Sequence, residues 1–182
     1  DGTPQAEALL RIDALSSALL PFAAGLWLLT VAVTPRGALD RGGLRRTALA
    51  TLVTVASFLT ESALLLLLLW ILSIWTFIAA LSDARHRHQR RVVSVYLGLS
   101  AVLLAIGVAL LIMPITRGTR LEVVGVWLVA LAAVIRAGII PFHAWVPEVF
   151  DRGRLGPAIL FSAPQLGAYV TVVLVVPRAA PD

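Results

Sequence analysis

The sequence predicts an all-α protein, a polytopic membrane helix bundle with about six spans. Of its 182 residues, 59% are hydrophobic and 14% are charged, whereas soluble domains carry about 25% charged residues. Apolar runs that are long enough to cross a hydrocarbon core of about 30 Å alternate with short loops that contain arginine. The net charge of +5 comes from arginine, without any lysine. Because these arginines border apolar runs, they indicate membrane topology and not binding to nucleic acid.

A single membrane domain is expected over residues 1–182. Its spans are expected at about 14–34, 46–60, 62–82, 92–113, 121–145 and 157–176. The stretch 47–81 is apolar except at Glu61, and as one helix it would be about 52 Å long, which exceeds any bilayer. We therefore expect two helices joined by a turn at residues 60–62, with Thr60 as the N-cap of the second helix.

The fifth span is expected to be broken at Pro141. Proline has no amide hydrogen, so the carbonyl of Ala137 would lose its helical partner next to Arg136. Arg136 itself follows an uncharged run, and ionisable groups at membrane depth mark ion or substrate pathways. If the helix runs on past the proline, Arg136 and His143 share one face. Pro147 and Pro164 are expected to mark two further helix breaks.

The loops predict an orientation. Residues 35–46, 83–91 and 147–156 would lie on one side of the membrane and hold most of the arginines. The positive-inside rule then places these loops in the cytoplasm and both termini outside.

Two ionisable residues near the break each have two interpretations. Arg136 either holds the broken helix together or takes part directly in transport, and His143 either makes a structural hydrogen bond or shuttles protons. We expect the charge of Arg136 to be neutralised by carbonyls, water and polar groups such as Gln165.

Polar residues elsewhere are candidates for the same pathway. Ser162, Gln165 and Tyr169 are spaced to share a helix face, either along the pathway or as contacts between helices. Glu61 either begins a helix at the outer surface or pairs with Arg136.

No cofactor or metal is expected. The chain has no cysteine, and His86 and His88 alone are a weak indication of zinc. Because the sequence contains no pattern of redox or hydrolytic chemistry, any enzyme activity would belong to partners.

The segment Arg136-Ala-Gly-Ile-Ile-Pro-Phe-His-Ala-Trp-Val-Pro-Glu148 resembles the signature K-x-x-x-x-P-F-H-x-W-L-P-D-A of the proton-translocating antiporter family. That family includes the antiporter-like membrane subunits of respiratory complex I and the large subunits of Mrp-type cation/proton antiporters. Three further segments resemble family motifs, namely residues 11–16, 67–73 and 165–169. The resemblance covers nearly the whole chain, as helices three to eight of a fourteen-helix protein.

The resemblance implies proton or cation translocation as a subunit of a complex I-like or Mrp-like assembly in a bacterial inner membrane. The partners would be the lipid bilayer and other membrane subunits, and the cargo protons or monovalent cations. Such a chain could belong to an NADH–quinone oxidoreductase-like complex. One alternative is the membrane subunit of a bicarbonate-accumulating complex, which resembles the same family. Another is a scaffold that docks a partner subunit without translocating anything.

The chain departs from the family at its charged positions. Ile71 stands where the family has a glutamate, and Arg136 stands where it has a lysine. The lysine or histidine of the next family helix falls on Gln165, Ser162 or Ile159, depending on the alignment of the loop. These departures concern proton-relay chemistry and leave the expected fold unchanged.

Overall fold

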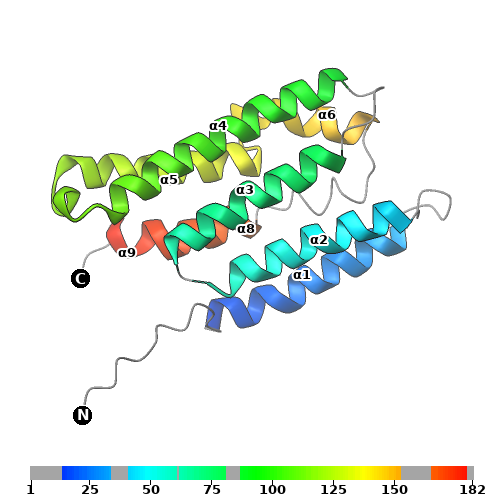
Figure 1. Ribbon diagram of the computed structural model, residues 1–182, viewed down its shortest axis with the longest axis horizontal. Coiled ribbons are helices and arrows are strands. Elements are labelled where there is room, and N and C mark those ends of the chain that lie inside the picture. Colours follow the sequence, from blue (N-terminus) through cyan, green and yellow to red (C-terminus); the bar gives the residue numbers. More distant parts are fainter. Residues whose placement is uncertain (1–13, 34–40, 61, 81–86, 153–164, 180–182) are drawn as a thin grey trace, which may run out of the picture.

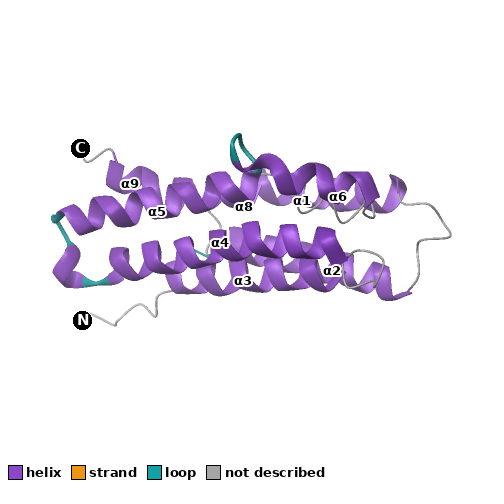
Figure 2. Ribbon diagram, turned by 90° about the horizontal axis from the view of Figure 1, so that it is seen from above, coloured by secondary structure: helices purple, strands orange, loops and turns teal. Residues whose placement is uncertain are grey.

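The computed structural model is all helical over the residues that it describes, which are 14–33, 41–60, 62–80, 87–152 and 165–179 (Figures 1 and 2). The α-helices are α1 (Ala14–Val33), α2 (Arg41–Phe58), α3 (Ala63–Ala80), α4 (Arg87–Ile112), α5 (Arg120–Ala137), α6 (Trp145–Arg152), α8 (Gln165–Val170) and α9 (Val176–Ala179). A short 3₁₀ helix, η3 (Pro114–Thr116), follows α4, and a second one, η4 (Phe142–Ala144), directly precedes α6. A π-helical turn, η5 (Thr171–Val175), joins α8 to α9 without interruption. The predicted all-α class is therefore confirmed.

The helices run back and forth along one long axis, so that consecutive long helices are antiparallel (Figures 1 and 2). Helices α1 and α2 form one pair and α4 and α5 another, with α3 between the two pairs. The start of α1 and the end of α9 consequently lie at the same end of the bundle (Figure 1).

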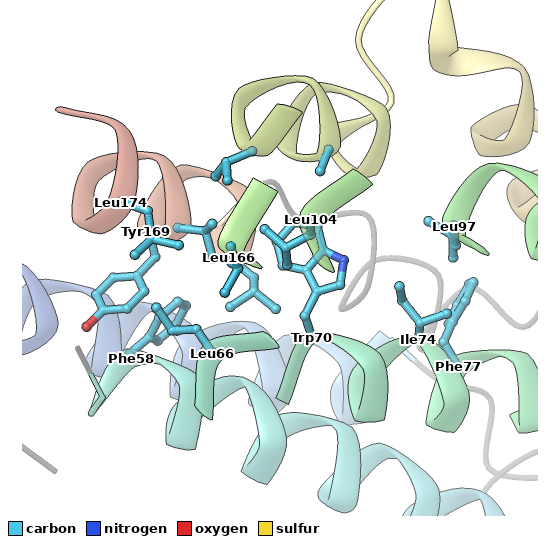
Figure 3. Packing of buried hydrophobic residues seen from close by; sticks show 14 of the residues in the cluster. Phe58, Leu66, Trp70, Ile74, Phe77, Leu97, Leu104, Leu166, Tyr169 and Leu174 are labelled. Atoms are coloured by element: carbon cyan, nitrogen blue, oxygen red, sulfur yellow. The ribbon is translucent and has the colours of Figure 1, made fainter. Parts of the chain in front are cut away.

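One buried apolar cluster joins α2, α3, α4, α5 and α8 (Figure 3). Trp70 and Leu66 of α3 lie at its centre, with Leu104 of α4 and Tyr169 of α8 beside them. Large apolar side chains are also exposed on the outer faces of several helices. The apolar surface is thus divided between an interior cluster and the periphery of the bundle.

The chain turns between α2 and α3, in the stretch where two helices were expected. The amide of Ser62 donates to Thr60 Oγ1 at 3.2 Å, and the amide of Leu66 donates to the Ser62 carbonyl at 2.8 Å. Ser62 therefore occupies the N-cap position of α3, and the prediction of Thr60 as the N-cap is wrong. The Thr60 hydroxyl instead stabilises the turn that leads into the cap.

Three helices extend into regions that were expected to be loops. Helix α2 begins at Arg41, α4 begins at Arg87, and α6 runs to Arg152. Arginine is a good helix former, so the helices continue into charged sequence where apolar character ends. Pro147 does not break a helix but lies in the first turn of α6, where its missing amide hydrogen is not needed.

Helices α4 and α5 pack closely because each has a glycine at the crossing. A Cβ atom on Gly107 would lie 2.8 Å from Val129 Cγ2 and 3.0 Å from the Gly125 carbonyl oxygen. A Cβ on Gly125 would lie 3.1 Å from Leu110 Cβ. Any larger side chain at either glycine would push the two helices apart.

Within the described residues, two segments are long and apolar enough to cross a membrane, Arg90–Ile112 and Arg120–Phe150. Residues Ser17–Ala32, Ala63–Ala79 and Gln165–Arg178 are apolar but shorter. Length and hydropathy therefore identify two candidate spans in this part of the chain.

Candidate functional site

The candidate site is the end of α5, where the helix stops at Gly138. Gly138 has φ 67° and ψ 33°, the left-handed conformation that glycine adopts without penalty. Its amide donates to the Ile135 carbonyl at 3.2 Å, and the Ile139 amide donates to the Val134 carbonyl at 3.2 Å. These two bonds form a Schellman motif, which ends the helix.

The predicted interruption of the fifth span is therefore confirmed, but the helix already ends at Gly138, three residues before Pro141. Pro141 follows a cis Ile140–Pro141 peptide bond, and the chain resumes in η4 and α6. The helix does not run on past the proline, so the shared face expected for Arg136 and His143 does not form. His143 lies in η4 and is exposed.

Trp145 ties the segment after the break back onto α5. Its indole Nε1 donates to the Ile135 carbonyl oxygen at 3.0 Å, and the whole side chain is buried. A Cβ on Gly138 would clash with Val146 Cγ2, so α6 sits directly against the glycine. The interruption is thus a packed and hydrogen-bonded structure, and not an open gap.

Arg136 lies in the last turn of α5 and is 5% exposed. Its Nη2 donates to Ser73 Oγ on α3 at 2.9 Å, and its Cζ lies 4.5 Å from the centroid of the Trp70 ring. The Ser73 hydroxyl donates in turn to the Trp70 carbonyl at 2.7 Å. The guanidinium is therefore held between a hydroxyl oxygen and an aromatic face.

This environment stabilises a positive charge in two ways. An aromatic ring attracts a cation over its face, and a cation in the last turn of a helix interacts favourably with the helix dipole. Because arginine keeps its proton under ordinary conditions, the site can provide a fixed positive charge. Unlike lysine or histidine, it is poorly suited to release and rebind a proton.

Gln165 is buried at the start of α8, and its Oε1 has no hydrogen-bond partner among the described residues. The expectation that Gln165 helps to neutralise Arg136 is therefore wrong for this oxygen. Helix α8 does pack against α5, because a Cβ on Gly167 would lie 3.3 Å from the Ala133 carbonyl oxygen. Gln165 thus contributes a buried acceptor close to α5.

Tyr169 makes contacts that join helices. Its phenol donates to the Thr60 carbonyl oxygen at 3.1 Å. Its ring meets Phe58 edge to face, with centroids 5.3 Å apart. Tyr169 therefore links the last helix to the turn that follows α2.

Other predicted residues are distributed as follows. Glu61, Ser162 and Pro164 lie outside the described residues. Ile71 is 44% exposed on α3. A carboxylate at this position would therefore lie on the outer face of the bundle. Within the described ranges, no group of three histidine, cysteine, aspartate or glutamate side chains could hold a metal ion.

Sequence reasoning did not select Ser73 or Trp145 as site residues. Ser73 interrupts an apolar stretch one helical turn after Trp70, and this polar interruption is the signal that could have identified it. Trp145 could not be assigned to Ile135, because the contact depends on how the chain folds back after Gly138.

No protein-family model matches the chain, and neither a curated protein nor a solved structure matches it.

Proposed function

We propose that the chain is an antiporter-like membrane subunit that takes part in proton or cation translocation within a larger complex, of complex I-like or Mrp-like type. The observation that carries the proposal is the buried guanidinium of Arg136 beside an interrupted helix. In this proposal the six helical passes cross the bilayer, and both termini lie on the extracytoplasmic side.

The surface of the bundle supports a membrane location. Leu28 of α1, Leu68 of α3 and Val102 of α4 are each more than half exposed. Helix α1 has 20 residues and so is about 30 Å long, which matches the hydrocarbon core. Water would not favour so many exposed apolar groups, whereas lipid would.

The interrupted helix supports a transport role. Non-helical backbone at membrane depth is tolerated where it is buried in protein or lines a watery cavity. Ionisable residues there are costly and commonly mark transport pathways. At the end of α5, Arg136 and the irregular backbone at Gly138 lie within two residues of each other.

In this proposal Arg136 acts as a fixed charge and other groups carry the ion. Its bond to Ser73 and its contact with Trp70 hold the guanidinium in place. A fixed cation raises the barrier for other cations nearby and thereby sets where along the pathway they can pause. Mobile protons would move over groups that can lose them, or over water.

A second candidate is the membrane subunit of a bicarbonate-accumulating complex. The same observation favours it, because a permanently charged buried arginine attracts an anion more readily than a cation. The two candidates differ in the ion that moves, so they can be separated by a transport assay.

The test compares Arg136→Lys and Arg136→Met in the assembled complex, reconstituted into vesicles. Proton and sodium movement would be followed with dyes, and bicarbonate uptake with labelled bicarbonate. Arg120→Met is the matched control, because Arg120 is exposed at the start of the same helix.

We expect Arg136→Met to assemble and to lose proton or cation movement, while Arg120→Met keeps it. Loss of bicarbonate uptake alone would favour the second candidate. Unchanged rates for Arg136→Met would reject a transport role for Arg136 and favour a scaffold. If Arg136→Met fails to assemble, Arg136→Lys takes its place because it keeps the positive charge. The transport rate of Arg136→Lys is then compared with that of the unaltered complex.

A further inference from the structure

Five exposed arginines lie in the first two turns of α2 and α4. They are Arg45 and Arg46 of α2 and Arg87, Arg90 and Arg91 of α4. We call this set the arginine collar. The site around Arg136 makes no use of it.

The collar lies at one end of the bundle. Helix α2 is antiparallel to α3, and α3 is antiparallel to α4, so the first turns of α2 and α4 point the same way (Figure 1). The described arginines at the opposite end are Arg117, Arg120 and Arg178, and Arg178 Nε lies 3.9 Å from Glu122 Oε1. Exposed positive charge is therefore concentrated at the collar end.

The charge of the collar interacts unfavourably with the dipoles of α2 and α4. A helix N-terminus carries partial positive charge, so arginines close to it are unfavourable and anions are favourable. The first turns of α2 and α4 contain no acidic residue. Among the described side chains, helix α6, which packs against α4, brings one carboxylate, that of Glu148, to this end, whereas the collar has five arginines. The collar end thus favours an additional anion.

The surface next to the collar is apolar, which distinguishes a lipid from an acidic protein. On α2, exposed Leu49 and Leu52 follow Arg46. On α4, exposed Val95 and Leu99 follow Arg91. From Arg91 to the end of α4 at Ile112 the helix is about 31 Å long, close to the thickness of the hydrocarbon core.

We propose that the arginine collar binds the headgroup phosphates of anionic phospholipids in the leaflet at that end of the bundle. The arginines would lie at headgroup depth, and the apolar side chains that follow them would contact the acyl chains. This inference rests on the proposed membrane location, and its experiment is chosen so that the two can fail separately.

The test uses the full chain with one reporter cysteine, which is possible because the sequence contains no cysteine. Val95→Cys lies one helical turn after Arg91, and Val124→Cys lies one turn after Arg120, and both valines are exposed. Each variant carries a fluorophore in vesicles of equal parts phosphatidylcholine and phosphatidylglycerol. Quenching is compared when one lipid or the other carries brominated acyl chains.

We expect phosphatidylglycerol to be enriched about fivefold at position 95, the effect of one well-placed arginine, and to show little enrichment at position 124. Replacing Arg45, Arg46, Arg90 and Arg91 together by glutamine should remove the enrichment. Replacing Arg117 and Arg120 by glutamine should leave it unchanged. If the fourfold variant does not fold, high salt added to the unaltered chain should remove the enrichment instead.

Equal enrichment at both positions, or enrichment that survives both the glutamine variants and salt, would overturn the inference. Absence of enrichment together with binding of added polyglutamate would assign the collar to an acidic protein and also overturn it. Failure of the chain to insert into pure phosphatidylcholine vesicles would reject the membrane location itself. Normal insertion without lipid preference would reject only the lipid site.

Discussion

The guanidinium of Arg136 and the hydroxyl of Ser73 are joined by a hydrogen bond of 2.9 Å that connects α5 to α3. The Ser73 hydroxyl donates its hydrogen bond to the Trp70 carbonyl, so its oxygen can accept a hydrogen bond from the guanidinium. The bond places a polar acceptor next to a charge inside an apolar bundle.

The first prediction concerns this bond. Ser73→Ala should lower the free energy of unfolding by about 2 kcal/mol, because a hydrogen bond to a charged group is lost and a buried donor remains. Thermal or denaturant unfolding of the purified protein in detergent measures it. Ser100→Ala is the control, since Ser100 is equally buried but donates only within its own helix to Leu97. Equal losses for the two variants would show that the bond to Arg136 adds nothing.

The second prediction concerns the end of α5. Gly138→Ala should destabilise the protein by about 3 kcal/mol, because it combines a left-handed conformation with a clash against Val146. Gly118→Ala should cost only about 1 kcal/mol, since Gly118 has a similar φ of 71° but open space around its Cβ position. The same unfolding assay compares the pair. A Gly138→Ala variant no less stable than Gly118→Ala would contradict the packing of α6 against the break.

The third prediction separates two roles for Tyr169. Tyr169→Phe should cost about 1 kcal/mol of stability through the lost bond to Thr60. The edge-to-face contact with Phe58 should survive, and transport in reconstituted vesicles should be unchanged. A variant of normal stability that no longer transports would instead assign the phenol to the ion pathway.

The fourth prediction is the orientation of the chain. His88→Cys at the start of α4 should be reached by an impermeant thiol reagent only from the cytoplasmic side, and Arg117→Cys after η3 only from outside. Both positions are exposed, so access depends on the side of the membrane and not on burial. Labelling of position 88 from outside intact cells would reverse the proposed topology.

Much of the helical layout follows from hydropathy, while the ends of the helices do not. Apolar run length separated α2 from α3 because a single helix would be too long for a bilayer. The starts at Arg41 and Arg87 were missed because hydropathy marks which residues can be buried, whereas arginine continues a helix equally well in water.

The candidate site around Arg136 could also be predicted only in part from the sequence. A charge in an apolar run pointed to Arg136, and a proline pointed to an interruption nearby. The sequence favours the proline as the cause of the interruption, because its missing amide hydrogen can be read directly from the residue type. The left-handed conformation of Gly138 is accompanied by local bonds to Ile135 and Val134, and a glycine followed three residues later by a proline is the local signal that could have identified this helix end. The contact between Arg136 and Ser73 joins residues 63 positions apart, and no local spacing encodes it.

The glycine crossing of α4 and α5 has a mechanical consequence. Sliding one helix along the other by a single residue, about 1.5 Å, would drive Val129 into the backbone at Gly107, because a Cβ there would already be within 2.8 Å of its Cγ2. Helices α4 and α5 are therefore expected to move as one rigid unit and not to slide along each other. A change in the angle between α5 and α6 would instead be centred on Gly138 and would have to break the hydrogen bond from Trp145 Nε1 to the Ile135 carbonyl.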